Sequence, residues 1–168
     1  EGAGTPIIRV KGVASLHGAE HVLIPDTIEA GTFIVLGVAS NSAITVRGMN
    51  PQHMDVVLER LRSMGANLEV GEDFVSVKPS QKIFASKIDT RTYPGIPTDL
   101  QSIFGVLATQ AEGMSMIHDT MFEGRMTYIQ ELARMGAHAE VCDPHRVVIT
   151  GPTPLHGCSI KSFDLRAG

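Results

Sequence analysis

The chain repeats itself over a long period, and this repetition limits its possible folds more than any other feature. The ten residues LRSMGANLEV at positions 61–70 return as LARMGAHAEV at 132–141, and the Ile-Pro pair at 24–25 returns at 96–97. Solenoid repeats have periods of roughly 20–50 residues, which is shorter than the spacing in this chain. We therefore expect tandem αβ modules, each large enough to hold its own share of the core.

A third copy begins near the end of the chain. The Leu-His-Gly triplet at positions 16–18 returns at 155–157, shortly before the sequence stops. We expect a first unit at about 1–80, a second at about 81–154 and the start of a third at 155–168, all within one lobe. Because the third copy is incomplete, the pattern suggests a piece of a longer protein.

Each unit reads as β-α-β-α-β-β, which predicts a mixed α/β (α+β) fold. Asn50 followed by Pro51 indicates a helix start, because asparagine caps helices and proline suits the first turn. Gly65 indicates the left-handed end of that helix. The elements expected in the first unit are strands at 7–10, 21–23 and 43–46, helices that begin at 25–27 and 50–51, and a hairpin of 67–70 and 74–77.

The second unit repeats this order without a low-complexity linker, so we expect the two units to share an interface. Its expected elements are strands at 83–88 and 114–117, helices that begin at 97–99 and 124–125, and a hairpin of 137–141 and 147–150. The helix that begins at 25–27 is apolar around most of its surface, as Phe33 and Leu36 illustrate, so we expect it to be well buried.

Composition and charge exclude several classes of function. The net charge of −4 gives no basic footprint, which argues against nucleic acid as a partner. No apolar run approaches the roughly 20 residues that span a bilayer, so no membrane partner is expected. Cys142 and Cys158 read as two free thiols in a reducing cytoplasm. His17 and His21 lie four residues apart in a segment that does not read as helical, so neither a metal site nor a cofactor is predicted.

The two units differ where the second helix of each begins. The second unit has Gly124-Arg125 where the first has His53-Met54, and Arg166 has a similar place in the third copy. Arginine is unfavourable in the first turn of a helix unless an anion lies there, because the helix N-terminus carries partial positive charge. A solvated surface arginine and an anion site therefore both remain open as interpretations.

Asp99 is expected in the first turn of the second unit's first helix. A carboxylate at this position commonly caps the helix, which stabilises it by roughly 1 kcal/mol. It could instead act as a general base, although a helix N-terminus favours the ionised form and so weakens the base. From the residue alone, capping is the preferred interpretation.

Several segments together resemble the UDP-N-acetylglucosamine 1-carboxyvinyltransferases, the enolpyruvyl transferases of bacterial cell-wall synthesis. The matching segments are EGAGT at 1–5, GTF at 31–33, GA at 65–66, VGED at 70–73, PTDLQ at 97–101, RMGAHA at 134–139 and DLRA at 164–167. Members of that family have two lobes, each of three β-α-β-α-β-β units, in a fold named the inside-out α/β barrel. The resemblance implies that this chain is most of the second, C-terminal lobe.

The resemblance also implies an activity and residues that perform it. The family transfers the enolpyruvyl group of phosphoenolpyruvate to the 3-hydroxyl of UDP-N-acetylglucosamine, which is the first committed step of peptidoglycan synthesis in the cytoplasm. Asp99 matches the family's proposed general base, and Met121 matches a position whose backbone touches the nucleotide sugar. Arg125 and Arg166 match arginines that bind the phosphoenolpyruvate carboxylate, and Asp164 matches an aspartate near the reacting centre.

The chain also departs from that family. A Lys-Asn pair and a cysteine-bearing loop of the first lobe are absent, as is a final arginine, and neither Cys142 nor Cys158 matches the family's cysteine. Only one wall of the active site is therefore expected, and we predict that this polypeptide alone turns over no substrate. Two alternatives remain: a lobe of the shikimate-pathway enolpyruvyl transferase, or a non-catalytic binding module of the same fold.

Overall fold

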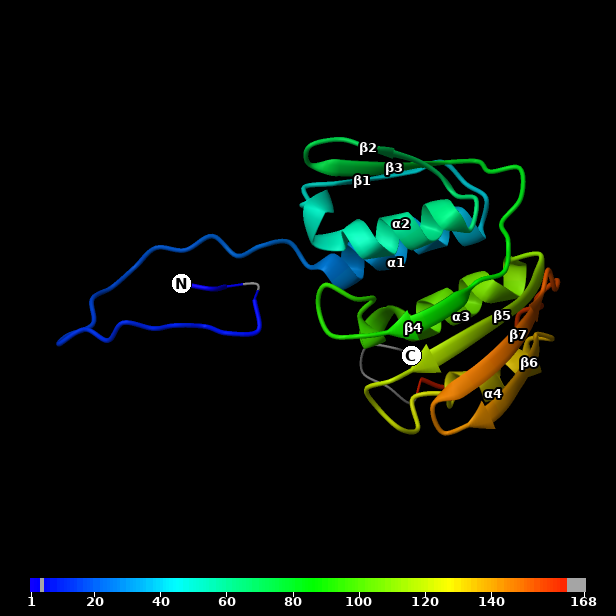
Figure 1. Cartoon of the computed structure of the whole chain (residues 1–168). Coiled ribbons are helices and arrows are strands. Elements are labelled where there is room, and N and C mark those ends of the chain that lie inside the picture. Colours follow the sequence, from blue (N-terminus) through cyan, green and yellow to red (C-terminus); the bar gives the residue numbers. More distant parts are fainter. Residues whose placement is uncertain (4, 163–168) are drawn as a thin grey trace.

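The computed structural model describes residues 1–3 and 5–162, which form two sheets with helices packed between and around them (Figure 1). The first sheet holds three strands in the order β1-β3-β2, and all its neighbouring pairs are antiparallel. The elements of this part are α1 (Thr27–Ala39), β1 (Ile44–Arg47), η1 (Pro51–Met54), α2 (Asp55–Ser63), β2 (Asn67–Val70) and β3 (Phe74–Lys78).

The second sheet holds four strands in the order β4-β5-β7-β6. Only β4 and β5 are parallel, and their register places Thr90 opposite Asp119 at their carboxyl ends. The elements of this part are β4 (Lys87–Thr90), η2 (Thr98–Leu100), α3 (Gln101–Gln110), β5 (Gly113–Asp119), α4 (Tyr128–Arg134), β6 (His138–Asp143) and β7 (Arg146–Gly151). The parallel pair brings the ends of two strands to one edge of the sheet, where polar side chains gather.

Local sequence signals account for most of the element ends. The Asp26 side chain accepts hydrogen bonds from the backbone N–H groups of Ile28 and Glu29 and so caps α1. Asn50 caps η1 by accepting from the backbone of Gln52, as its position before Pro51 predicts. Each Met-Gly-Ala segment ends its helix through a glycine of positive φ, +100° at Gly65 and +99° at Gly136, which only glycine adopts freely.

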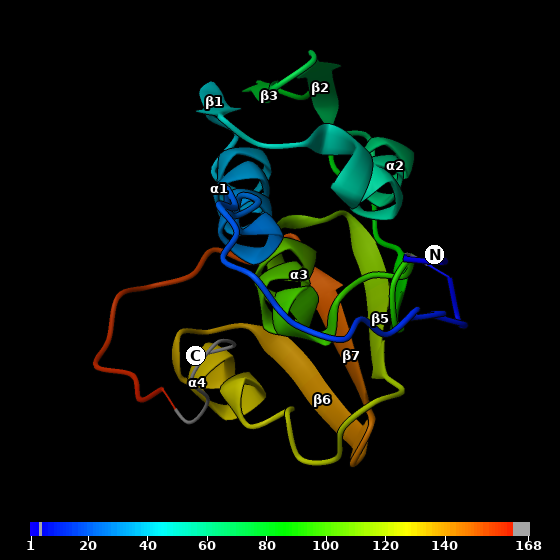
Figure 2. The same ribbon diagram turned by 90° about the vertical axis from the view of Figure 1, so that its left-hand side faces the viewer.

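The core is continuous between the two sheets. Helices α1 and α3 pack against each other there, as Figure 2 shows from a second direction. Ile34 of α1 and Phe104 of α3 are both fully buried. The α1 helix is less enclosed than predicted, because Phe33 and Leu36 remain 47% and 50% exposed on a side that no described element covers.

Two predicted strands of the first unit are absent from the described residues. The segments 7–10 and 21–23 form no strand, and their apolar side chains are exposed, Val22 by 89%. A strand needs a neighbour with which to exchange a series of backbone hydrogen bonds, and among the described residues these segments have only the exchange between Arg9 and Glu1. In the second unit the strand expected at 83–88 begins only at Lys87, although Phe84 forms an isolated bridge with Glu112.

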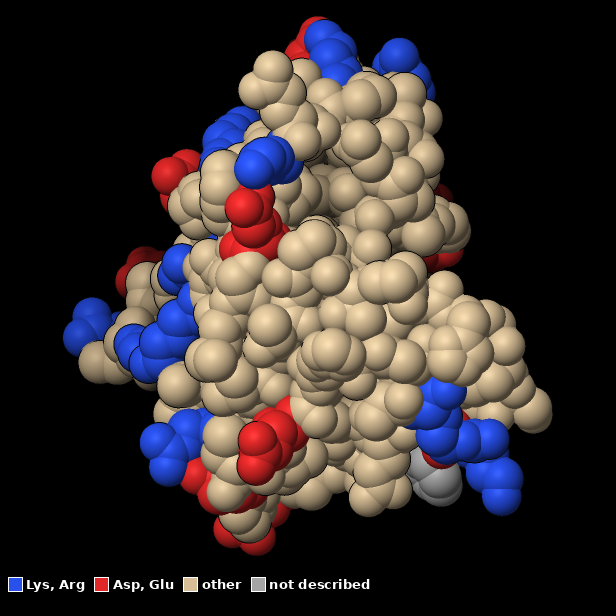
Figure 3. Space-filling view, turned by 90° about the vertical axis from the view of Figure 1, so that its right-hand side faces the viewer, with Lys and Arg blue, Asp and Glu red and all other residues tan. Residues whose placement is uncertain are grey.

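The surface opposite the N-terminal segment is mostly uncharged at its centre, with Lys, Arg, Asp and Glu side chains at its margins (Figure 3). Within residues 1–3 and 5–162, none of the helices combines the length and apolarity that crossing a bilayer requires.

Candidate functional site

The predicted site residues that the structure describes meet at the carboxyl ends of β4 and β5. Asp99 comes from η2, which follows β4, whereas Met121 and Arg125 come from the turn that follows β5. In an open sheet, ligands commonly bind where neighbouring parallel strands end. The parallel pairing of β4 with β5 therefore brings segments more than 20 residues apart to one rim.

Asp99 does not cap its helix. No side chain caps η2, and an oxygen of Asp99, Oδ1, instead accepts a hydrogen bond from Arg125 Nη1 at 2.9 Å. The capping interpretation that the residue alone favoured is therefore wrong. With 32% of its side chain exposed, Asp99 reaches both its cationic partner and solvent.

Arg125 lies in a turn, not in the first turn of a helix. The α4 helix begins at Tyr128, three residues later than predicted, and Gly124 has a φ of +78° that is incompatible with a helix start. Only 16% of the Arg125 side chain is exposed, so the solvated interpretation is also wrong. Its Nη1 donates to Thr98 Oγ1 at 3.0 Å, and its guanidinium lies 5.4 Å from the centre of the Phe122 ring.

Asp119 is a central residue of the site that the sequence analysis missed. It ends β5, is fully buried, and accepts hydrogen bonds from the hydroxyls of Thr90 and Thr98. Its Oδ1 also accepts from the backbone N–H groups of Met121 at 2.8 Å and Phe122 at 3.2 Å. One carboxylate thus joins the ends of both parallel strands to η2 and to the turn that carries Met121.

A signal for Asp119 was present in the repeat. At the shift of 71 positions that aligns the two Met-Gly-Ala segments, Asp119 corresponds to Gly48. This difference between the units is of the same kind as the one at Arg125, which corresponds to Met54 at that shift.

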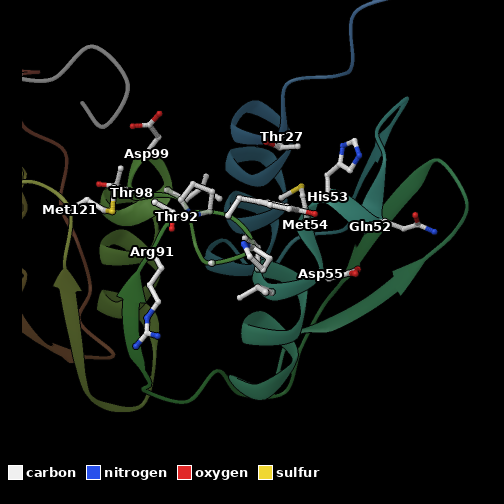
Figure 4. A pocket seen from close by; sticks show the side chains of 17 residues that line it. Thr27, Gln52, His53, Met54, Asp55, Arg91, Thr92, Thr98, Asp99 and Met121 are labelled. Carbon is white, nitrogen blue, oxygen red and sulfur yellow. The ribbon is translucent and has the colours of Figure 1, made fainter. Parts of the chain in front are cut away.

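A cavity of about 370 Å³ opens beside this network (Figure 4). Asp99, Thr98 and Met121 line one end of it, and Gln52 and His53 of η1 line the other. Tyr93, Pro94 and Leu100 contribute apolar surface. The cavity therefore combines a carboxylate and hydroxyls with an apolar wall, as small-molecule sites commonly do.

Two titratable groups near the network, Tyr128 and Asp89, have shifted pKa values. Burial raises the pKa of the Tyr128 hydroxyl, and the negative charge of Asp119 raises it further, so this phenol stays neutral. Burial alone would raise the pKa of Asp89, but hydrogen bonds from Lys87 and His118 outweigh it and lower that pKa. His145 contacts the backbone carbonyl of Asp119 through Nδ1 at 2.8 Å, which fixes the end of β5 from its other side.

Two predicted site residues, Asp164 and Arg166, lie outside the described residues. The structure therefore brings together Asp99, Met121 and Arg125, and it adds Thr98 and Asp119 to them.

Comparison with known proteins agrees with this architecture. A sequence model of the EPSP synthase (3-phosphoshikimate 1-carboxyvinyltransferase) family matches residues 1–168. UDP-N-acetylglucosamine 1-carboxyvinyltransferase 2 of Bacillus cereus is 44% identical over the whole chain, and that of Bacillus subtilis is 41% identical. The chain spans only 39% of the length of either relative.

A solved structure gives the same picture of the fold. The enolpyruvyl transferase NikO from Streptomyces tendae matches with a TM-score of 0.78 and 28% sequence identity, over 86% of this chain and 35% of NikO. These findings confirm the predicted fold class and the predicted resemblance. Because the family's sequence model extends over the entire chain, this chain belongs to the EPSP synthase (3-phosphoshikimate 1-carboxyvinyltransferase) family.

Proposed function

We propose that this chain is one lobe of a UDP-N-acetylglucosamine 1-carboxyvinyltransferase. The observation that carries the proposal is the ion pair of Asp99 and Arg125 at the rim of a cavity that Met121 also lines. The identity of 44% to relatives of that name supports the nucleotide sugar as acceptor over the shikimate-pathway alternative. It also favours an enzyme lobe over a non-catalytic binding module.

The net reaction defines what the site must do. A bond forms between the sugar 3-oxygen and C2 of phosphoenolpyruvate, the bond from C2 to the phosphate oxygen breaks, and the hydroxyl proton leaves. In this proposal Asp99 accepts that proton, which requires its carboxylate within hydrogen-bond reach of the hydroxyl. Its 32% exposed side chain gives a substrate access to it.

Arg125 binds the carboxylate of phosphoenolpyruvate in this proposal. A guanidinium presents a planar fork of donors that matches a carboxylate in fixed geometry. Contacts with Thr98, Asp99 and the Phe122 ring already orient this fork. We assign Arg166 to the same carboxylate and Asp164 to the reacting centre, and we place the backbone of Met121 against the nucleotide sugar.

The rest of the site belongs, in this proposal, to a second lobe. Because the chain spans 39% of its relatives, we expect the opposite wall of the cleft to lie in the other part of such an enzyme. The 168-residue chain alone should then release no phosphate and bind UDP-N-acetylglucosamine weakly or not at all. We place the reaction in the cytoplasm, as a step of peptidoglycan synthesis that serves cell-wall formation and cell shape. Cys142 and Cys158, two exposed free thiols, suit that reducing compartment.

The test is a graft. This chain replaces the matching segment of the Bacillus cereus relative, and phosphate release is measured with phosphoenolpyruvate and either UDP-N-acetylglucosamine or shikimate 3-phosphate. We expect turnover with the nucleotide sugar only. Asp99→Asn in the graft should lower kcat by about 100-fold or more, in the range typical of general-base removal.

Asp73→Asn is the matched control, because it makes the same chemical change in the exposed β2–β3 turn, away from the cavity. Turnover of shikimate 3-phosphate would overturn the choice of acceptor. Unchanged turnover in Asp99→Asn would overturn the role of Asp99.

A further inference from the structure

We propose that Asp119 is a positioning residue for the transfer reaction, acting on Arg125 and Asp99 through the Thr98 hydroxyl. This inference rests on the function proposed above. The Asp119 side chain makes no direct contact with Asp99, and in this proposal it touches neither substrate.

The buried environment of Asp119 indicates a fixed carboxylate. Its exposed fraction is zero, and four groups donate to its two oxygens: the hydroxyls of Thr90 and Thr98 and the backbone N–H groups of Met121 and Phe122. Burying a charge is costly unless hydrogen bonds satisfy it, and these donors satisfy it. Since the donors come from three separate segments, β4, η2 and the turn after β5, moving this carboxylate would disturb all of them together.

The direction of the hydrogen bonds links Asp119 to Arg125. A threonine hydroxyl has one proton and two lone pairs. Thr98 gives its proton to Asp119 Oδ2, which leaves its oxygen to accept from Arg125 Nη1 at 3.0 Å. Because both Asp119 oxygens accept from donors, this carboxyl group sets the orientation of the Thr98 hydroxyl and turns a lone pair toward the guanidinium.

The same carboxylate also sets the turn that follows β5. Met121 and Phe122 donate their backbone N–H groups to Oδ1, and the Phe122 ring lies against the Arg125 guanidinium. Asp119 therefore reaches Arg125 along two paths, one through Thr98 and one through this turn. Arg125 then reaches Asp99 at 2.9 Å, so the spacing of both proposed reacting groups depends on Asp119.

The isosteric change Asp119→Asn separates positioning from packing. An amide nitrogen in place of Oδ2 would donate to Thr98 instead of accepting its proton, so the hydroxyl would lose the acceptor that orients it against Arg125. In the graft we expect kcat to fall by about 10- to 100-fold, as misplaced reacting groups typically cause, with the KM for UDP-N-acetylglucosamine changed less than about threefold. Thr98→Val should reproduce this loss while it leaves the buried carboxylate in place. Thr98→Ser keeps the hydroxyl, so this variant should retain activity to within about threefold of wild type.

The double variant Asp119→Asn, Thr98→Val gives the decisive readout. Because both changes interrupt one path, we expect its kcat to match that of the worse single variant. Losses that multiply, or full activity in Asp119→Asn, would overturn the proposal. Asp73→Asn serves again as the control for the chemical change.

A second measurement uses the 168-residue chain and needs no turnover. The NMR signals of the Arg125 guanidinium should show slow rotation in the wild type and faster rotation in Asp119→Asn and Thr98→Val, but not in Thr98→Ser. If the graft is inactive yet these signals respond as expected, the proposed function fails while the positioning path stands. Signals that are unchanged in both variants would overturn the positioning path itself.

Discussion

Arg125 Nη1 lies 2.9 Å from Asp99 Oδ1, and this contact joins the turn before α4 to the first turn of η2. In the proposed reaction each residue has a second partner, the sugar hydroxyl for Asp99 and the phosphoenolpyruvate carboxylate for Arg125. A carboxylate that binds Arg125 would compete with Asp99 for the guanidinium and free the aspartate for the sugar hydroxyl. The pair is therefore well placed to change partners when the first substrate binds.

The first prediction concerns the strength of this ion pair. The pair is partly buried, with 16% and 32% of the two side chains exposed, so we expect a coupling energy of about 1 kcal/mol, at the upper end for surface pairs. A double-mutant cycle of Asp99→Asn and Arg125→Met measures it by urea unfolding of the 168-residue chain. The exposed pair of Lys78 and Glu69, 2.7 Å apart, is the control and should show a smaller coupling. Equal coupling in both pairs would contradict the prediction.

Local signals in the sequence predicted the elements whose causes are local. The cap at Asn50 and the left-handed glycine at Gly65 lie where the sequence placed them. Apolar residues at 7–10 and 21–23 also fit a strand pattern, yet the pattern carries no information on whether a neighbouring strand is available. Those two predictions therefore failed for a reason that is not local.

The candidate site shows a similar division. Asp99 and Arg125 were identified from their residue types and from the resemblance, but their contact depends on the parallel pairing of β4 with β5, which no local signal specifies. Asp119 was missed because a single aspartate at a strand end has no distinctive spacing. Only its burial and its four donors distinguish it from an ordinary turn residue.

A second prediction concerns the contact between α3 and α4. A Cβ atom at Gly105 would lie 2.5 Å from the Tyr128 hydroxyl oxygen, which is closer than real contacts allow. Gly105→Ala should therefore lower the free energy of unfolding by about 1–3 kcal/mol, as overpacking typically does, even though alanine favours helix. Urea unfolding checks this, with Gly18→Ala as the control because nothing lies within 4 Å of a Cβ there.

Tyr128→Phe tests whether the hydroxyl is the cause. Within the described residues this buried oxygen has no hydrogen-bond partner, so its removal should cost little by itself. In the double variant Gly105→Ala, Tyr128→Phe, part of the lost stability should return. A double variant as unstable as Gly105→Ala alone would place the strain elsewhere.

A third prediction concerns the N-terminal segment. Residues 5–26 are almost entirely exposed, and the hydrogen bonds described for Arg9 join it only to Glu1. Trypsin should cleave the 168-residue chain first after Arg9 and Lys11, because an exposed extended backbone fits a protease site. Mass spectrometry would identify the cuts. The trimmed chain should keep its thermal midpoint to within about 1 °C, since the segment adds little to the core. A lower midpoint would show that the segment packs on the folded part.

A fourth prediction concerns acid stability. The pKa of Asp89 lies below its ordinary value of 3.8, because hydrogen bonds from Lys87 and His118 outweigh the opposing effect of burial. An aspartate with a lowered pKa in the folded state stabilises the fold above its unfolded pKa, and this contribution is lost as the pH falls through the folded pKa. Asp89→Asn should therefore be less stable than wild type at pH 7, and the difference should shrink from about pH 4 downward. Urea unfolding at a series of pH values and constant ionic strength measures the difference.

Repeating the series in 1 M NaCl should reduce the difference at pH 7, because Lys87 and Asp89 are partly exposed and salt screens their attraction. A difference that stays constant from pH 7 to pH 2 would mean that the charge of Asp89 does not stabilise the fold.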